Sequence, residues 1–177
     1  MSARLRPCQL LVALALALTA AAAFAQADMR AEIERMYRAG ETAQAMQRLD
    51  AALASKPDDA DLRFLKGVML AEQQRPAEAI VVYERLTQDF PGLAEPFNNL
   101  AVLYAAEGRF DKARDALEAA LRNDPRYATA YENLGDVYLR LAVQAYEHSG
   151  ANTPSRQRKL RLTRDLLLRS SGDASGS

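Results

Sequence analysis

The sequence predicts an all-α protein built from antiparallel helix pairs that repeat along the chain. Pro57, Pro91 and Pro125 are spaced 34 residues apart, and each follows a segment with helical periodicity. Counting back from each proline defines repeat 1 (residues 26–59), repeat 2 (residues 60–93) and repeat 3 (residues 94–127). A fixed period of this length is typical of a solenoid, in which each repeat packs on its neighbours.

Each repeat is predicted to contain two helices separated by a tight turn. In repeat 3, apolar residues from Phe97 to Tyr104 follow the spacing i, i+3, i+4, i+7, which is typical of one face of a helix. The same spacing resumes at Phe110 and continues to Leu121. Gly108 lies between the two segments, where a left-handed residue is needed to end the first helix.

Small residues recur at the same place in successive repeats. Ala45, Ala79 and Ala113 align with one another. The large residues Leu49, Tyr83 and Leu117 follow them by four positions, on the same helix face. Small side chains beside large ones allow the two helices of a pair to approach closely. We therefore expect these six positions to be buried between helices.

These residues resemble the motif of the tetratricopeptide repeat family, which has an aromatic, Leu-Gly or Leu-Ala, Tyr, Gly, Ala, a large residue, Ala and Pro. Repeat 3 fills almost every place. A degenerate repeat 4 (residues 128–149) begins with Tyr131 and Tyr138 but has no turn glycine near position 142, which predicts one long helix. The resemblance implies a right-handed superhelical solenoid over residues 26–149.

Residues 1–25 have the pattern of a secretory signal peptide. Two arginines precede an apolar run over residues 10–23, and a small-x-small cleavage site ends at Ala25, with an alternative after Ala27. The other interpretation is an uncleaved membrane anchor. Cys8 precedes the apolar run, so lipoprotein anchoring is not predicted. Export, an Ala-rich composition and 19 Arg against 4 Lys together predict a periplasmic bacterial protein.

A basic segment over residues 150–169 is predicted to form a C-terminal capping helix, followed by a disordered tail over residues 170–177. Residues 26–152 hold 15 basic and 21 acidic side chains, whereas residues 153–177 hold 6 and 2. Two interpretations of this helix stay open: a solvating cap on the solenoid, or a helix that docks on anionic lipid. Its cations are Arg156, Arg158, Lys159, Arg161, Arg164 and Arg169.

Catalysis is not predicted. The sequence has one cysteine and one histidine, His148, for which we find neither a nucleophile nor an orienting partner. Asp58, Asp59 and Asp61 precede a helix and are interpreted as capping residues rather than metal ligands. We predict no catalytic, metal-binding or cofactor-binding residue and no cofactor. The formal net charge of zero argues against a nucleic-acid partner.

The resemblance implies that function lies on the concave face, which the first helix of each repeat lines. Its groove mixes apolar and acidic side chains and suits a peptide or helix with hydrophobic anchors and some positive charge. We expect a scaffold or assembly factor of the cell envelope, either a monomer or a weak homo-oligomer. The predicted protein-binding residues are Arg30, Glu34, Asp61, Phe64, Val68, Glu72, Glu95, Asn98, Val102, Glu132, Asp136 and Arg140.

Overall fold

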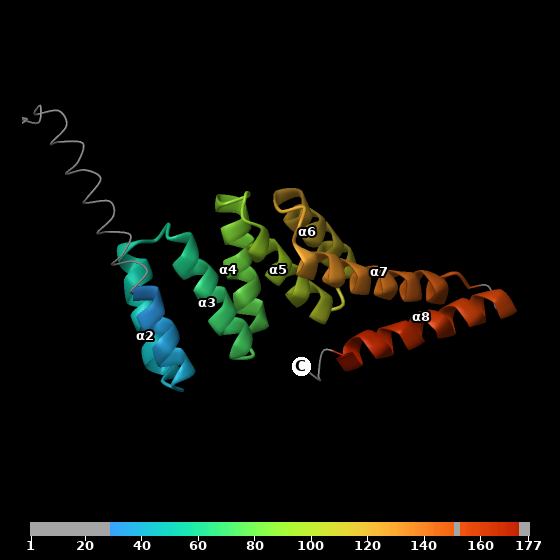
Figure 1. Cartoon of the computed structure of the whole chain (residues 1–177), viewed down its shortest axis with the longest axis horizontal. Coiled ribbons are helices and arrows are strands. Elements are labelled where there is room, and N and C mark those ends of the chain that lie inside the picture. Colours follow the sequence, from blue (N-terminus) through green and yellow to red (C-terminus); the bar gives the residue numbers. More distant parts are fainter. Residues whose placement is uncertain (1–28, 151–152, 174–177) are drawn as a thin grey trace, which may run out of the picture. The chain divides into compact units, whose positions relative to one another are not determined.

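The structure, a computed structural model, describes residues 29–150 and 153–173. These residues form helices and turns, with no strand among them (Figure 1). The chain divides into an N-terminal unit (residues 1–62) and a C-terminal unit (residues 63–177). The predicted signal peptide lies outside the described residues.

The N-terminal unit contains the two helices expected for repeat 1. A helix over residues 29–38 is followed by α2 (Thr42–Ser55). Ile33, Ala45 and Leu49 are fully buried and form the centre of this helix pair. Before α3 (Ala60–Glu72), the Asp59 carboxylate accepts a hydrogen bond from the Leu62 backbone N–H at 3.1 Å, which confirms its capping role.

The C-terminal unit continues from α3 through five more helices. Consecutive helices from α4 to α8 pack on one another, and α5 also meets α7, so neighbouring first helices of successive repeats lie side by side (Figure 1). The bounds are α4 (Pro76–Asp89), α5 (Ala94–Ala106), α6 (Phe110–Asn123), α7 (Ala128–His148) and α8 (Pro154–Asp173).

The small and large positions of the repeats are buried, as predicted. Ala79 and Ala113 are fully buried, and Tyr83 and Leu117 are 1% exposed. Opposite Tyr83, α3 carries Gly67, where an added Cβ would lie only 2.5 Å from two carbons of the Tyr83 ring. The large side chain of Tyr83 on the second helix therefore requires a residue without a side chain, Gly67, on the first helix.

The turn between the two helices has a left-handed residue in each of repeats 1 to 3. Gly40 and Gly108 have φ values of +84° and +74°, which confirms the left-handed role predicted for Gly108. Repeat 2 makes the same turn with Gln74, at φ +58°. The Arg75 N–H donates to the Leu70 carbonyl at 3.0 Å, as the Arg109 N–H donates to the Tyr104 carbonyl at 2.9 Å.

Helix α7 runs without a break to His148, as the missing turn glycine predicted. Its motif residues are open to solvent: Tyr131 is 54% and Tyr138 is 48% exposed, whereas Tyr104, one repeat before Tyr138, is 6% exposed. Apart from its chain neighbours and its own helix backbone, a Cβ built at Gly135 would meet no described atom within 4 Å. The face that packs on a second helix in repeat 3 therefore stays uncovered on α7.

Helix α8 turns back alongside α7 (Figure 1). It continues to Asp173, so the predicted helix end at Arg169 and the predicted start of a disordered tail at Ser170 are four residues too early. Adding a residue to an existing helix costs little even for serine, because the costly step is nucleation. Residues 174–177 lie outside the described residues.

Candidate functional site

The predicted groove residues of the N-terminal unit form ion pairs with one another. Arg30 Nε donates to Glu34 Oε1 at 2.9 Å, and Arg30 Nη1 lies 3.7 Å from Asp61 Oδ1. Glu34 also accepts a hydrogen bond from Arg38 at 2.9 Å. Exposed pairs of this kind contribute at most about 1 kcal/mol each. They present balanced charge rather than an unpaired cation.

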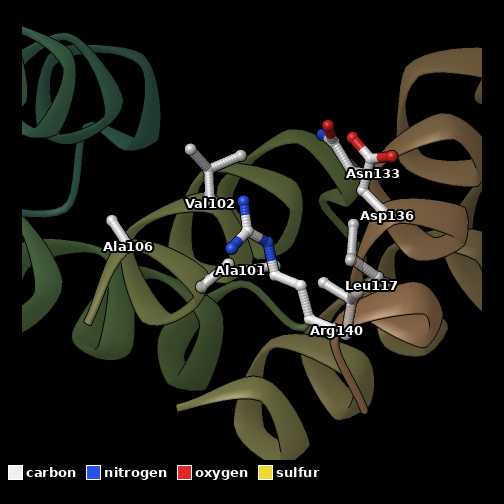
Figure 2. A pocket seen from close by; sticks show the side chains of 9 residues that line it. Ala101, Val102, Ala106, Leu117, Asn133, Asp136 and Arg140 are labelled. Carbon is white, nitrogen blue, oxygen red and sulfur yellow. The ribbon is translucent and has the colours of Figure 1, made fainter. Parts of the chain in front are cut away.

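The C-terminal unit has a hollow of about 360 Å³ between α5 and α7, which we call the α5–α7 hollow. It brings together three of the predicted residues: Val102 from α5, and Asp136 and Arg140 from α7 (Figure 2). The remaining lining residues are Ala101, Ala105, Ala106, Leu117, Asn133 and Val137.

The side chains around this hollow divide into an apolar wall and a polar rim. In Figure 2, Arg140 extends its guanidinium group toward Val102, while Asn133 and Asp136 stand together on the opposite side. The Arg140 Cζ lies 5.6 Å from the centre of the Phe110 ring, within the range of a cation–π contact. A ligand in the α5–α7 hollow would therefore meet the Arg140 guanidinium, the Asp136 carboxylate and the Asn133 amide beside aliphatic side chains.

A second hollow of about 220 Å³, the α3–α5 hollow, is lined by the predicted residues Val68, Glu72 and Val102. Val102 is 48% exposed and lines both hollows, so it forms the ridge between them. Glu72 is the only ionised side chain in the lining. The other lining residues are Ala71, Tyr83, Asn99 and Leu103.

Half-buried amides connect the helices around the two hollows. Asn99 Nδ2 donates to the Tyr83 hydroxyl at 3.1 Å, and Asn133 Nδ2 donates to Asn98 Oδ1 at 2.9 Å. Burial raises the pKa of Tyr83 to about 12, so its hydroxyl stays neutral near pH 7. These bonds tie α4 to α5 and α5 to α7, and they hold the walls of the hollows in place.

The structure corrects the prediction for Asn98. Its side chain is only 4% exposed, so it is not an open groove residue. Asn98 Nδ2 donates to Asn99 Oδ1 at 3.4 Å. The side-chain oxygen of Asn98 accepts a hydrogen bond from Asn133 Nδ2. Because the amide is covered by the following repeat, Asn98 connects α5 and α7 rather than facing a partner.

Three further predicted residues do not line either hollow. Phe64 is half-buried and packs against Tyr83, with ring centroids 5.8 Å apart. Glu95 and Glu132 are exposed at the starts of α5 and α7. The structure therefore brings together Val68, Glu72, Val102, Asp136 and Arg140 as the core of the candidate site.

The sequence analysis missed the amides and alanines that shape the hollows. Asn99 and Asn133 are 34 residues apart, so the period itself was a signal for a repeated polar place. Ala105 and Ala106 carried no comparable signal. They line the α5–α7 hollow because their small side chains leave space at the end of α5.

Repeated helix pairs with hollows between their first helices define a helical repeat protein of the protein-binding type. Two sequence models described as tetratricopeptide repeat match residues 30–94 and 70–135, which together cover more than half of the chain. The chain belongs to the tetratricopeptide repeat family. The predicted fold class, an all-α solenoid of helix pairs, is confirmed.

Two curated relatives share the repeat region. The chain is 37% identical over 98 residues to the Arabidopsis thaliana chloroplast protein PYG7, covering 49% of this chain and 32% of PYG7. It is 27% identical over 89 residues to the photosystem I assembly protein Ycf3 of Prochlorococcus marinus, covering 49% of this chain and 51% of Ycf3. The chain thus spans about a third and about half of these relatives.

The crystal structure of MamA shares the fold. It superimposes with a TM-score of 0.59 at 20% identity, covering 79% of this chain and 88% of MamA. At that identity the likeness concerns the fold alone. Tetratricopeptide repeat proteins are protein-interaction or assembly scaffolds.

Proposed function

We propose that this chain is a non-catalytic scaffold or assembly factor that binds a peptide or helix of a partner protein across α3, α5 and α7. The observation that carries the proposal is the exposed ridge at Val102, with a hollow on each side of it. Hollows that flank an exposed apolar side chain provide places for anchor residues, which supply most of the affinity at protein interfaces.

The two hollows select different anchors. In the α3–α5 hollow, Val68, Leu103 and the Tyr83 ring favour an aliphatic side chain, and Glu72 favours a cation beside it. In the α5–α7 hollow, Arg140 and Asp136 favour a polar or zwitterionic stretch of the same ligand. The ligand we propose is a segment with an aliphatic anchor next to a Lys or Arg.

The environment of His148 supports a non-catalytic role. Its Nδ1 lies 2.8 Å from the Gln144 carbonyl on the same exposed helix end, which favours the Nδ1–H tautomer and a local hydrogen bond. It does not line either hollow. A general base would need a substrate pocket and an orienting partner beside it.

We place the scaffold in the bacterial cell envelope. The support for this location is the signal-peptide pattern of residues 1–25 together with the Arg-rich, Lys-poor composition. The support for a role in assembly is the similarity to Ycf3, whose name describes it as an assembly protein.

Photo-crosslinking in living cells tests the proposal. A photoreactive amino acid is placed at position 68, 102 or 81, one at a time. Val81 on α4 is the matched control, because it is a valine with an exposed fraction of 47%, against 48% for Val102, and it lines neither hollow. We expect the same partner adduct from positions 68 and 102 and none from 81. Equal adducts from 81, or none from 68 and 102, would contradict the proposal.

A further inference from the structure

Helix α8 is attached to α7 by one side only. Leu160 and Leu167 on that side are half-buried. Arg156 Nε donates to the Tyr146 carbonyl, and Arg164 forms an ion pair with Glu147. These contacts account for the capping interpretation of the helix, because they hold it against the end of the repeats.

A second apolar stripe lies on another side of α8 and is about half exposed. Leu162 is 57% exposed and Leu166 is 53% exposed. The two leucines are four residues apart, so they lie one above the other on the helix surface. They lie away from Leu160 and Leu167, which face α7.

Cations lie on both sides of this stripe. At 3.6 residues per turn, Arg158 and Arg169 fall on one side of Leu162 and Leu166. Lys159 falls on the other side, where its ammonium lies 6.0 Å from the centre of the Tyr146 ring on α7. Arg158 and Arg169 are exposed, and neither pairs with a carboxylate in the part of the chain that the structure describes. Asp165, the one acidic side chain between Pro154 and Arg169, lies on the same flank as Arg158 and Arg169, so the face keeps an excess of positive charge of about two.

We propose that this face, the Leu162–Leu166 stripe with its flanking cations, docks on an anionic lipid surface. Leucines between long basic side chains match a headgroup layer, because the aliphatic stems extend along the apolar boundary while the charged ends reach the phosphates. A lipid surface also needs no shaped pocket, which suits a convex helix. A protein partner would gain specificity from hollows, and those described above lie on α3, α5 and α7.

The inference extends the proposed function, since it concerns a different helix and leaves the two hollows free. None of the described helices has the length and apolar character needed to cross a membrane. The contact we propose lies at the membrane surface and depends on charge, because the stripe is flanked by cations. It would hold the scaffold at a membrane while the hollows bind the partner.

Vesicle sedimentation tests the inference without any protein partner. The full chain is mixed with vesicles of phosphatidylcholine alone or of phosphatidylcholine with phosphatidylglycerol. We expect binding only to the vesicles with phosphatidylglycerol, and we expect it to fall steeply with added salt because screening weakens exposed charges. The double variant Leu162→Ser/Leu166→Ser should lower the affinity at least tenfold.

Leu168→Ser is the matched control. Leu168 is 73% exposed on the same helix but lies on a different side from the stripe, so its loss should leave vesicle binding unchanged. Circular dichroism checks that every variant stays helical.

Three results would overturn the proposal: no binding to anionic vesicles, equal losses for the stripe and control variants, or light scattering that shows a dimer which the stripe variant alone dissociates. The last result would assign the stripe to a second copy of the chain.

Discussion

The hydroxyl of Tyr104 donates a hydrogen bond to the carboxylate of Glu84, which joins α5 to the preceding helix α4. One repeat later, the hydroxyl of Tyr138 donates to Glu118 at 3.3 Å. In the first pair Tyr104 is 6% exposed and Glu84 is half-buried, whereas the second pair is exposed, with Tyr138 at 48%. The same bond therefore occurs in two dielectric environments within one unit.

We expect Tyr104→Phe to lower the free energy of unfolding by about 1–2 kcal/mol, because the bond to Glu84 involves a charged acceptor in a buried place. Tyr138→Phe should cost only a few tenths of a kcal/mol, because water replaces an exposed bond. Urea unfolding of the two variants measures the difference. Equal losses would contradict the assignment.

The same tyrosines predict how stability falls at alkaline pH. Burial, and then the hydrogen bond and negative charge of Glu84, raise the pKa of Tyr104 to about 12. Burial raises the pKa of Tyr83 to about 12 as well. An unfolded tyrosine loses its proton near pH 10. The stabilisation is therefore complete below about pH 10 and is lost as the pH rises toward 12.

We expect the free energy of unfolding to fall between about pH 9 and about pH 11, and to fall less in the variant Tyr83→Phe/Tyr104→Phe. Urea titrations at the two pH values measure the change. An identical pH slope in the variant and the parent chain would show that these two hydroxyls do not carry the effect.

Two glycines at the same place in their repeats should respond to alanine with opposite signs. Gly67→Ala places a methyl group 2.5 Å from two carbons of the Tyr83 ring, and Tyr83 is 1% exposed and held by a hydrogen bond from Asn99. We expect a net loss of about 1–2 kcal/mol, since overpacking outweighs the gain in helix propensity. Gly135→Ala meets no described atom within 4 Å and should gain about 0.5–1 kcal/mol. Matched urea midpoints decide the signs, and a stabilised Gly67→Ala variant would refute the close contact.

The left-handed turns give a second pair of backbone variants. Gln74→Gly should raise the free energy of unfolding by up to about 1 kcal/mol, because Gln74 holds φ +58° with a side chain. Gly108→Ala, at φ +74°, should lower it by about 1 kcal/mol. Gln74→Ala is the control and should change little, since it keeps the strained Cβ. Thermal midpoints measure all three, and a destabilised Gln74→Gly variant would contradict the account.

The repeat period predicted the buried framework because burial at those places is set within one helix pair. Ala79 and Ala113 are buried because each faces a neighbouring helix at close range. A close approach requires a small side chain, so the sequence shows it as a recurring alanine. The left-handed turn at Gly108 was visible for the same reason. The left-handed conformation of Gln74 could not be predicted, because glutamine, unlike glycine, is not typical of that conformation.

The site residues were harder to predict because their exposure depends on the next repeat. Phe64, Asn98 and Glu132 occupy the same place in successive repeats, yet Phe64 is half-buried, Asn98 is buried and Glu132 is exposed. Asn98 is covered because Asn133 on α7 reaches it, whereas among the described residues α7 is followed by the single helix α8, and Glu132 stays exposed. A motif place fixes the direction of a side chain, and neighbouring helices fix its accessibility.

The central claim is that the partner binds at the Val102 ridge between the two hollows. The most direct test uses the purified partner that the crosslinking experiment identifies. Its affinity is measured for three purified proteins: the parent chain, the Val102→Arg variant and the Val81→Arg variant. Because Val102 lines both hollows, an arginine there should weaken binding at least tenfold, while Val81→Arg should bind as the parent does. Unchanged binding by Val102→Arg, or an equal loss with Val81→Arg, would contradict the account.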